Sequence, residues 1–485
     1  MTQRSNVLIA GAGPVGLTMA NELTRYGIAV RIIDKAAQRT DKSKALVLWS
    51  RTLELFDQAG YADEFLSAGM AAHGAEISNG KEVLARVSFD GVESRHPYAL
   101  MIPQSDTERI LEERLEGQGV KVERTVTLEK FTDLGPRVEA VVRGADGESE
   151  TPGIDWLIGC DGAHSIVRHG LGLAFEGTTE PSDWYLADGH IAGLEPHDRL
   201  HIFWHKDGIL AFFPITDGRW RVVADLGPAR DDGHHPDPTL EEVQALMTAR
   251  GSKAVMRDPY WLASFRINER KVARYGQGRV FLAGDAAHIH SPAGGQGMNT
   301  GMQDAFNLAW KLSLVIRGVC KPALLDSYSI ERSAVGDMVL RNAGRLTEAA
   351  IMRNPIAQGL RNAVVKFALG FPQLEHRAAD TLAELDISYP DSPLTVNGGH
   401  HPRNRKAGER WPERLPSSDG KARFTALGPG DAVAELAKEF SQLVQGIPTS
   451  SGDLRVIRPD GYIGFASAAS DCAGAMAYLE ALAAT

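Results

Sequence analysis

Three glycines near the start of the chain have the spacing that brings a phosphate group close to a peptide backbone. Gly11, Gly13 and Gly16 form a G-x-G-x-x-G pattern, with Pro14 and Val15 between the last two. Gly11 allows a tight turn, Gly13 lets a pyrophosphate approach the backbone, and Gly16 lets a helix pack closely on a strand. The amides and the partial positive charge at the start of that helix would bind the phosphates.

An acidic residue lies where such a site needs a ligand for ribose. Val7–Ala10 is a short apolar run before the glycines, and Ile28–Ile33 is a second β-rich run that leads into Asp34. Asp34 therefore stands near the roughly 20-residue spacing expected of the acid that binds a ribose hydroxyl. This order of strand, turn, helix and strand predicts a dinucleotide site, and the alternative is a glycine-rich turn that binds nothing. The pattern alone does not separate NAD from FAD.

Two later segments also place an acidic residue beside a glycine. Asp161-Gly162 lies within the run Ile158–Arg168, and Gly284-Asp285 follows the apolar run Val280–Ala283. A glycine-rich loop, Pro292–Asn299, comes soon after the second of these pairs. We expect these segments to decide which dinucleotide is bound.

The elements that position these residues can be predicted from periodicity and capping signals. Apolar residues recur at helical spacing over Val15–Leu23, and Gly27 stands where a helix C-cap belongs. Ser105–Glu108 has the form of a capping box, which places Pro103-Gln104 at the mouth of another helix.

A β-rich region interrupts this α/β pattern in the middle of the chain. The runs Leu200–Trp204, Ile209–Phe213 and Trp220–Leu226 are rich in aromatic and β-branched residues. Asp207-Gly208 and Asp217-Gly218 separate them, and Asp-Gly between such runs is a strong hairpin signal. We expect an antiparallel sheet inserted between two halves of an α/β domain.

The chain after this sheet is predicted to be mostly helical before a final small unit. Apolar residues from Ala305 to Leu312 indicate an amphipathic helix, and helices continue to about Ala383. Residues 390–412 are rich in Pro, Gly, Asn and Arg and are typical of a linker. The rest of the chain, to Thr485, looks like a small separate α/β unit.

Length and composition limit the class of protein. A chain of 485 residues predicts two or three domains, and 43% hydrophobic with 24% charged residues is typical of a globular protein. The formal net charge of −10 argues against nucleic acid and anionic membranes as partners. No apolar stretch is long enough to span a bilayer. We interpret Val7–Ala10 as a buried strand and not as part of a signal peptide.

The three cysteines, Cys160, Cys320 and Cys472, are far apart and form no C-x-x-C pair. A disulfide framework, a zinc site and a dithiol redox centre are therefore not expected, and we expect all three to be small buried residues. A cytoplasmic location is the natural inference, and no metal site is predicted.

Five further residues each have two interpretations. His288 and His290 could act near a cofactor, although packing or backbone hydrogen bonding is the interpretation that we favour. Trp204, Phe212 and Phe213 could line a substrate cavity or pack in the core of the sheet.

Taken together, the three motifs in this order resemble the class A flavoprotein monooxygenases, the family of p-hydroxybenzoate and phenol hydroxylases. The resemblance spans residues 1 to about 395. It implies an α/β fold, a Rossmann-like FAD-binding domain with an inserted antiparallel sheet for substrate. Gly408–Pro412 and Arg458–Tyr462 resemble the thioredoxin-like tail of the phenol and polyketide hydroxylase branch, here without C-x-x-C. The implied domains are 1–174 and 271–395 for FAD, 175–270 for substrate, and 396–485 for the tail.

The resemblance also implies roles for particular residues. Asp285 would bind the ribityl chain of FAD, and Gly295–Asn299 would turn backbone amides towards the flavin ring. Asp161-Gly162 would contribute to both FAD and NADPH. Lys44 stands where the family usually has an arginine, and it offers only a point charge in place of a bidentate contact. The expected cofactor-binding residues are Gly11, Gly13, Pro14, Val15, Gly16, Asp34, Lys35, Lys44, Gln104, Val126, Asp161, Gly162, Gly284, Asp285, Pro292, Gly295, Gln296, Gly297, Met298 and Asn299.

The function that the resemblance implies is hydroxylation of a phenolic or polycyclic polyketide-like substrate. Bound FAD would be reduced by NAD(P)H, with NADPH favoured, and would react with O2 to form a C4a-hydroperoxide. No catalytic side chain is assigned, because the flavin supplies the chemistry. The alternatives are Baeyer–Villiger oxidation or drug-inactivating hydroxylation on the same fold, and a silent FAD-binding protein. The partners expected are a small aromatic molecule and O2, with the chain a monomer or a homodimer.

Overall fold

The computed structural model describes residues 6–216, 218–228, 235–399, 405–416, 420–468 and 471–484. Asp217 of the expected Asp217-Gly218 turn lies outside these residues. Within the described part, no helix is both long and apolar enough to cross a membrane.

A mostly parallel sheet of six strands forms the centre of the nucleotide-binding part. Its order is β19-β20-β13-β1-β2-β8, and only the short edge strand β19 runs antiparallel to its neighbour. The apolar runs that predicted β1 and β20 are buried throughout, as strands covered on both faces must be. In spatial order the strands are β19 (Gly276–Gln277), β20 (Val280–Leu282), β13 (Trp156–Gly159), β1 (Val7–Ala10), β2 (Val30–Asp34) and β8 (Val122–Arg124).

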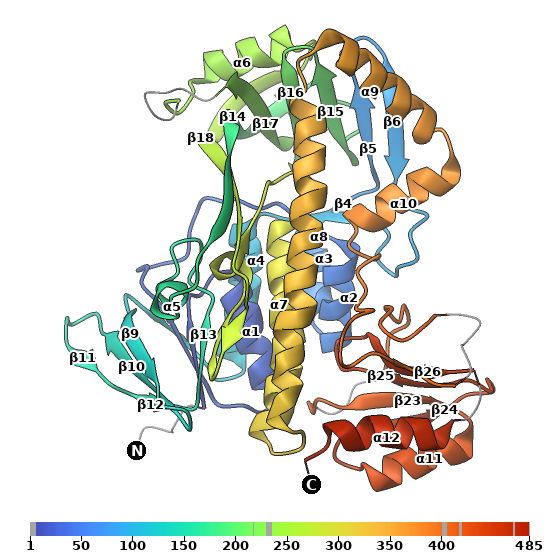
Figure 1. Cartoon of the computed structure of the whole chain (residues 1–485). Helices are drawn as coiled ribbons and strands as arrows, with labels where there is room; N and C mark the ends of the chain where they lie inside the picture. Colours follow the sequence, from blue (N-terminus) through green and yellow to red (C-terminus); the bar gives the residue numbers. More distant parts are fainter. Residues whose placement is uncertain are drawn as a thin grey trace.

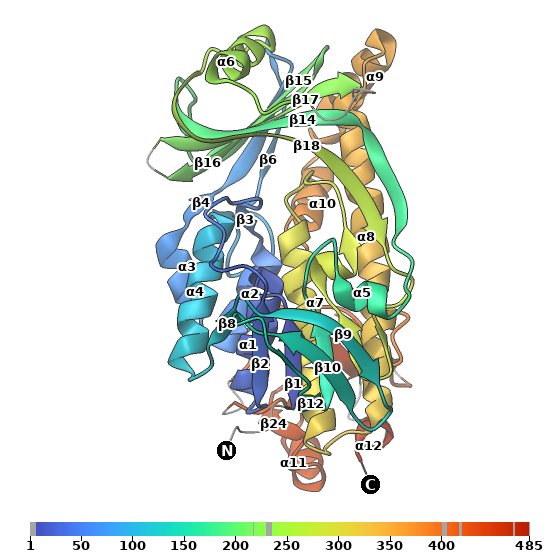
Figure 2. The same cartoon turned by 90° about the vertical axis from the view of Figure 1, so that its left-hand side faces the viewer.

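Helices and a small antiparallel sheet cover this parallel sheet (Figure 2). Helix α1 (Pro14–Arg25) packs against α7 (Gly297–Ile316) and α4 (Gln104–Gly117). Gly27 follows α1 with φ +75°, as its predicted place beyond the helix end requires. The small sheet and the short helix beside it are β9 (Thr127–Asp133), β10 (Val138–Arg143), β11 (Ser149–Glu150), β12 (Gly153–Ile154) and α5 (Ile166–Gly170).

The predicted capping box is wrong, although the predicted position of the helix is confirmed. Helix α4 begins at Gln104, with Pro103 as its N-cap, so Ser105 already lies inside the first turn. The Ser105 hydroxyl lies 3.0 Å from that of Ser43, and Glu108 accepts a hydrogen bond from the Gln104 side chain. Contacts with a distant loop therefore replace the local capping pattern.

An eight-stranded sheet forms the other large layer, at the upper end of the molecule in Figure 1. The predicted hairpin strands are present, so the inserted sheet is confirmed. It is not wholly antiparallel, because β15 pairs in parallel with β5, from a much earlier part of the chain. In spatial order its strands are β21 (His288–Ile289), β18 (Val255–Lys271), β14 (Glu176–Ala192), β17 (Arg219–Pro228), β16 (Gly208–Thr216), β15 (Arg199–His205), β5 (Gly74–Ser78) and β6 (Val83–Ser88).

A three-stranded sheet and two short helices lie between the parallel sheet and the eight-stranded sheet. The sheet has the order β3-β7-β4, and both β4 and β7 contact β16 of the large sheet. The outer face of the large sheet is covered by α6, which starts with a complete capping box between Thr239 and Glu242. The elements are β3 (Val47–Leu48), α2 (Ser50–Ala59), α3 (Ala62–Ala68), β4 (Met70–Ala72), β7 (Ala99–Met101) and α6 (Leu240–Ala249).

Long helices follow the central motifs, as predicted. In Figure 1, α8 runs almost the full height of the molecule and connects its two ends. The elements are the 3-10 turns η1 (Gly284–Ala286) and η2 (Pro322–Leu325), and the helices α8 (Asp326–Ile351), α9 (Pro355–Ala368) and α10 (Pro372–Leu382).

The terminal unit has the expected thioredoxin-like strand arrangement. Its sheet has the order β22-β26-β25-β23-β24, in which β23 and β24 are parallel and β25 and β26 antiparallel. The predicted linker is partly wrong, since β22 already belongs to this sheet. The elements are β22 (Val396–Asn397), β23 (Phe424–Gly428), α11 (Gly430–Glu439), β24 (Val444–Pro448), β25 (Leu454–Ile457), β26 (Ile463–Ser467) and α12 (Cys472–Leu482). Cys160 and Cys320 are buried as expected, whereas Cys472 is partly exposed.

The terminal unit is not separate, because buried ion pairs join it to α7 and α8. Glu331 of α8 accepts hydrogen bonds from Arg458 (2.6 Å) and from Lys311 of α7 (2.7 Å). Arg458 also pairs with Asp460, which accepts a hydrogen bond from the Trp310 indole. Burial lowers the pKa of Lys311 to about 8, whereas Arg458 and Lys311 outweigh burial and hold the pKa of Glu331 well below its usual range.

This cluster also corrects the predicted amphipathic helix. Every residue of α7 from Asn299 to Leu314 is buried, so the helix has no solvent-facing polar side. Its polar residues are satisfied inside the protein instead.

Removing Arg458 should therefore destabilise the whole molecule and not only the tail. We expect Arg458→Met to lower the free energy of unfolding by about 3–5 kcal/mol, because Glu331 and Asp460 would lose a buried partner. Arg414→Met, at a half-exposed arginine of the same unit, is the matched control. Denaturant unfolding followed by tryptophan fluorescence measures both. A loss below about 1 kcal/mol for Arg458→Met would contradict the structural role given to this cluster.

Candidate functional site

The glycine turn has the geometry that a phosphate site needs. Gly11 has φ +100°, and a Cβ there would lie 2.3 Å from the Cys160 carbonyl oxygen. A Cβ on Gly16 would lie 1.9 Å from the Gly11 carbonyl oxygen, so the protein itself requires both glycines. A Cβ on Gly13 would meet no atom within 4 Å. Protein packing does not explain Gly13, but a ligand lying against its backbone does.

The end of β2 carries the expected acid. Asp34 accepts hydrogen bonds from the backbone amides of Ala12 (2.7 Å) and Ala36 (2.8 Å), which hold its carboxylate beside the glycine turn. Val126 donates its backbone N–H to the Asp34 carbonyl and so lies at the same strand end. Lys35 is exposed there.

Asp161 is held by the helix that follows it. One carboxylate oxygen, Oδ2, accepts from the amides of Ile166 (2.7 Å) and Val167 (3.3 Å). The other, Oδ1, is buried and has no hydrogen-bond partner among the described residues. A buried carboxylate oxygen without a partner is costly, so a donor from a bound molecule is the natural complement. Gly162 follows with φ +79°.

The Gly284-Asp285 turn packs directly on the first glycine motif. Gly284 has φ +59°, and a Cβ on it would lie 2.7 Å from a methyl carbon of Val15. The Asp285 side chain is exposed to solvent, yet the surrounding protein raises its pKa by desolvation. His288 and Lys44 act in the opposite direction on this pKa. The Gly284-Asp285 turn therefore lies directly beside the first glycine motif.

A residue that the sequence did not single out, Asp304 of α7, fixes this turn. Its Oδ2 accepts from the Gly284 amide (3.0 Å) and lies 2.8 Å from His288 Nε2, and its Oδ1 accepts from Arg332 Nε (2.6 Å). Although burial acts to raise the pKa of Asp304, Arg332 and His288 lower it below the usual value. Arg332 also donates to the carbonyl of Thr300 in the first turns of α7. His288 is thus a packed structural residue, as favoured.

The start of α7 presents backbone amides, and not side chains, near the Gly284-Asp285 turn. The Asn299 side chain bonds to the backbone of Trp49, Val47 and Gly295, and Gln296 donates to the Thr381 carbonyl. Their side chains are therefore committed to the protein. Gly297 begins the helix, so any flavin contact from this loop would come from amides, as the resemblance implies.

A second link that the sequence did not reveal joins the large sheet to this region. Arg221 forms a bidentate pair with Asp188 (2.7 and 2.8 Å) and donates its remaining nitrogen to the Lys44 carbonyl (2.9 Å). Gln104 accepts from the Ala45 amide. The exposed Lys44 therefore lies on a loop that is held by the large sheet through Arg221 and by helix α4 through Gln104.

The three aromatic residues have different roles. Phe212 is buried in the cluster under α6, and Trp204 packs below the Arg361 guanidinium. Both are core residues. Phe213 points to the opposite face and is only partly buried, on the side that carries Arg221. The cavity-lining alternative therefore stays open for Phe213 alone.

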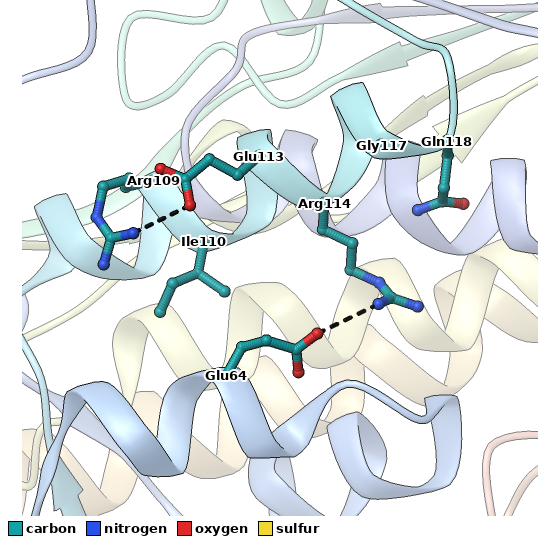
Figure 3. Close-up of a pocket in the computed structure, with 7 residues that line it drawn as sticks. All are labelled: Glu64, Arg109, Ile110, Glu113, Arg114, Gly117 and Gln118. Atoms are coloured by element: carbon teal, nitrogen blue, oxygen red, sulfur yellow. Dashed lines mark hydrogen bonds and ion pairs between the residues drawn. The ribbon is translucent and has the colours of Figure 1, made fainter.

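A surface groove on the helical side of the molecule is not this site. It has a volume of about 540 Å³ and lies between α3 and α4, as Figure 3 shows. Its charges are paired with each other, Arg109 with Glu113 and Arg114 with Glu64. None of the cofactor motifs lines it, so we assign it no part in cofactor binding.

The parallel sheet, the bare Gly13 backbone and the unpaired oxygen of Asp161 together fit a dinucleotide such as FAD. A family model described as "FAD binding domain" matches residues 4–343. The chain is 37% identical to 6-methylpretetramide 4-monooxygenase of Streptomyces rimosus, over 98% of this chain and 93% of that protein. It is 34% identical to an uncharacterized aromatic compound monooxygenase of Bacillus subtilis, over 97% and 96%. The solved anhydrotetracycline hydroxylase of Streptomyces rimosus superposes with a TM-score of 0.82 at 31% identity, covering 100% of each chain.

These features define a flavoprotein monooxygenase. The chain belongs to the FAD binding domain family, and within it to the FAD-dependent aromatic hydroxylases, so the resemblance and the expected fold are confirmed.

Two glycine substitutions should separate folding from cofactor binding. We expect Gly13→Ala to keep the apoprotein's melting temperature while FAD affinity falls at least ~10-fold, because the new methyl occupies space open only to a ligand. Gly16→Ala should destabilise the apoprotein by about 1–3 kcal/mol or more, because its methyl clashes with the backbone. Flavin titration and thermal melting measure both. Unchanged flavin affinity in Gly13→Ala would exclude phosphate binding at this turn.

Asp304→Asn should disturb both stability and flavin binding. Arg332 would keep a buried charge without its carboxylate, at a cost of about 3–5 kcal/mol, and the Gly284 amide would lose part of its acceptor. The matched control is Asp337→Asn, at a half-exposed aspartate of α8 that pairs with Lys271. Melting and the flavin-to-protein ratio of the purified variants provide the readout. Equal values for the two variants would show that Asp304 does not anchor the Gly284-Asp285 turn.

Proposed function

We propose that this protein hydroxylates a planar, polycyclic phenolic substrate at the expense of NAD(P)H and O2. The proposal rests on one observation: monooxygenases that are named after polycyclic aromatic compounds match this chain over nearly its whole length. The match includes the large sheet, which forms the layer facing the FAD motifs. The apolar and aromatic side chains on the inner face of that sheet are consistent with a flat aromatic substrate.

The residues proposed to hold FAD follow from the geometry of the motifs. The open backbone at Gly13 and the start of α1 would take the pyrophosphate, and Asp34 would take a ribose hydroxyl. Asp285 would accept hydrogen bonds from the ribityl chain. The amides at Gly297, at the start of α7, would stabilise negative charge at the edge of the flavin ring. Bound flavin supplies electron transfer and oxygen activation, for which protein side chains have no equivalent.

The inner face of the large sheet supplies the proposed substrate wall. Phe213, Val223 and Trp261 are each only partly buried, and Trp261 lies beside the Arg221 guanidinium. The Arg221–Asp188 pair is itself buried, so its charges are satisfied before any ligand binds. An apolar wall with aromatic side chains favours a flat aromatic ligand. The same wall would exclude water from the reacting region.

NADPH is proposed as a co-substrate that binds transiently and then dissociates. The chain contains a single G-x-G-x-x-G pattern, and that pattern is assigned to FAD. The nicotinamide would therefore reach the flavin through a groove that has no nucleotide fold of its own.

The domain limits of 1–174, 175–270, 271–395 and 396–485 remain our proposal for how FAD binding, substrate binding and the tail are divided along the chain.

Turnover of the flavin-loaded protein tests this function. We expect NADPH oxidation and O2 uptake to rise at least ~10-fold when a hydroxylated anthraquinone or tetracene is added, and less with simple phenols. With isotopically labelled O2, one labelled oxygen atom should enter the product as a ring hydroxyl.

Product structure distinguishes the alternatives. Oxygen inserted into a carbon–carbon bond would indicate Baeyer–Villiger oxidation and would overturn hydroxylation. Flavin-loaded protein that shows no substrate-stimulated O2 uptake across the panel would indicate a silent FAD-binding protein. Gly13→Ala, compared at equal protein concentration, controls for activity that does not depend on the bound flavin.

A further inference from the structure

Helices α9 and α10 expose a continuous stripe of large apolar side chains. The four members on α9 recur at the three- and four-residue spacing of one helix face, and the other two lie at the start of α10. Most of them are more than half exposed, which is unusual for a packed helix of a globular protein. The apolar stripe consists of Ile356 (85% exposed), Leu360 (66%), Val364 (54%), Phe367 (71%), Phe371 (43%) and Leu374 (42%).

The face of α9 that packs on the protein carries buried polar side chains beside the apolar Val365. Gln358 and Arg361 are both buried, and Gln358 donates to the carbonyls of Lys206 and Met352. Arg361 donates to the Ala349 carbonyl (2.7 Å), and its guanidinium lies 4.6 Å from the centre of the Trp204 ring. These contacts fix the rotation of the helix, so the apolar stripe cannot turn inward. Val365 and Leu369 also pack on the hydrophobic cluster around Trp204, so the apolar stripe is an additional apolar face and not the one that holds α9 on the protein.

The size of the apolar stripe fits a protein interface. At about 100 Å² for each side chain, its six residues expose on the order of 600 Å², the upper end of what a monomer normally leaves uncovered. With its small neighbours it approaches the ~800 Å² per partner of a standard interface.

The charges around the apolar stripe argue against a lipid surface. Arg353 pairs with Asp225 (3.0 Å) and Lys366 with Glu82 (2.9 Å), so these two cations are neutralised within the chain, and Arg361 is buried. The chain carries a net charge of −10 and would be repelled by anionic lipids. What remains is a neutral apolar face.

The order of large and small residues along α9 makes this face self-complementary. Gly359 and Ala363 are exposed between the large side chains, and a Cβ on Gly359 would meet no atom within 4 Å. If a second α9 lies antiparallel about a two-fold axis between residues 361 and 362, Gly359 faces Val364 of the copy and Ala363 faces Leu360. Ile356 then faces Phe367 at each end. Large residues fill the gaps at small ones, and the helix dipoles oppose each other favourably.

We propose that α9 is the core of a two-fold interface with a second copy of this chain. The interface would lie at the outer rim of the molecule in Figure 1, beside β6 and away from the cofactor motifs. Phe371 and Leu374 of the α9–α10 corner would extend it on both sides. The proposal does not depend on the proposed function, because none of these residues belongs to the site.

Sedimentation analysis of the flavin-loaded full chain tests the interface. We expect the wild type to be a dimer at micromolar concentration and Leu360→Glu or Phe367→Glu to weaken dimerisation roughly 30-fold or more, since each buries a charge within the interface. Leu134→Glu, at an apolar residue 44% exposed between β9 and β10, is the matched control and should remain dimeric. Melting temperature and flavin content should match the wild type in all three variants.

A compensating pair tests the register. Gly359→Leu should dissociate the dimer, because its side chain would occupy the place of Val364 of the partner subunit. Adding Val364→Ala to the same chain should restore dimerisation, since both copies of the contact regain room. A monomeric wild type, or a Gly359→Leu variant that still dimerises, would overturn the proposal. Binding of a monomeric wild type to neutral lipid vesicles would equally overturn it and would indicate a membrane-facing role for the apolar stripe.

Discussion

The buried carboxylate of Asp304 is the constraint on which the functional region depends. It accepts from the Gly284 amide and from Arg332, and it lies against His288, so one side chain connects the turn before Asp285, the helix α7 and the helix α8. A buried ion pair with complete hydrogen bonding contributes little net stability but is costly to break, and it admits few alternative arrangements. The Gly284-Asp285 turn and the start of α7 are therefore held at a fixed distance from each other before any cofactor arrives.

The same principle connects the substrate layer and the tail to this centre. Arg221 joins the large sheet to the Lys44 loop, and Glu331 joins the terminal unit to α7. Helix α7 thus serves as an internal axis whose polar residues all face protein. These buried pairs would set the distance between the flavin and the large sheet, and so the space that a planar substrate would occupy. The tail, which lacks a dithiol, contributes by completing the buried pairs around α7.

The sequence predicted what local patterns determine. The G-x-G-x-x-G turn, the Asp34 position and the hairpin strands around Asp207-Gly208 follow from spacing and backbone preference, and all are present. Two of the predictions that were wrong share one cause, a long-range contact. Ser105 bonds to a distant loop instead of capping its helix, and α7 hides its polar face in long-range ion pairs. Asp304 and Arg332 lie 28 residues apart, and no periodicity or motif marks such partners.

Amide hydrogen exchange of the full chain with and without FAD is the decisive measurement for this preorganised site. The Gly284–Ala286 turn and the first turn of α7 from Gly297 should become protected together, because Asp304 of α7 bonds to the Gly284 amide. Addition of FAD should slow exchange in both segments together and in the turn at Gly13, while the groove between α3 and α4 stays unchanged. Protection confined to that groove, or to only one of the two segments, would contradict a site held by Asp304.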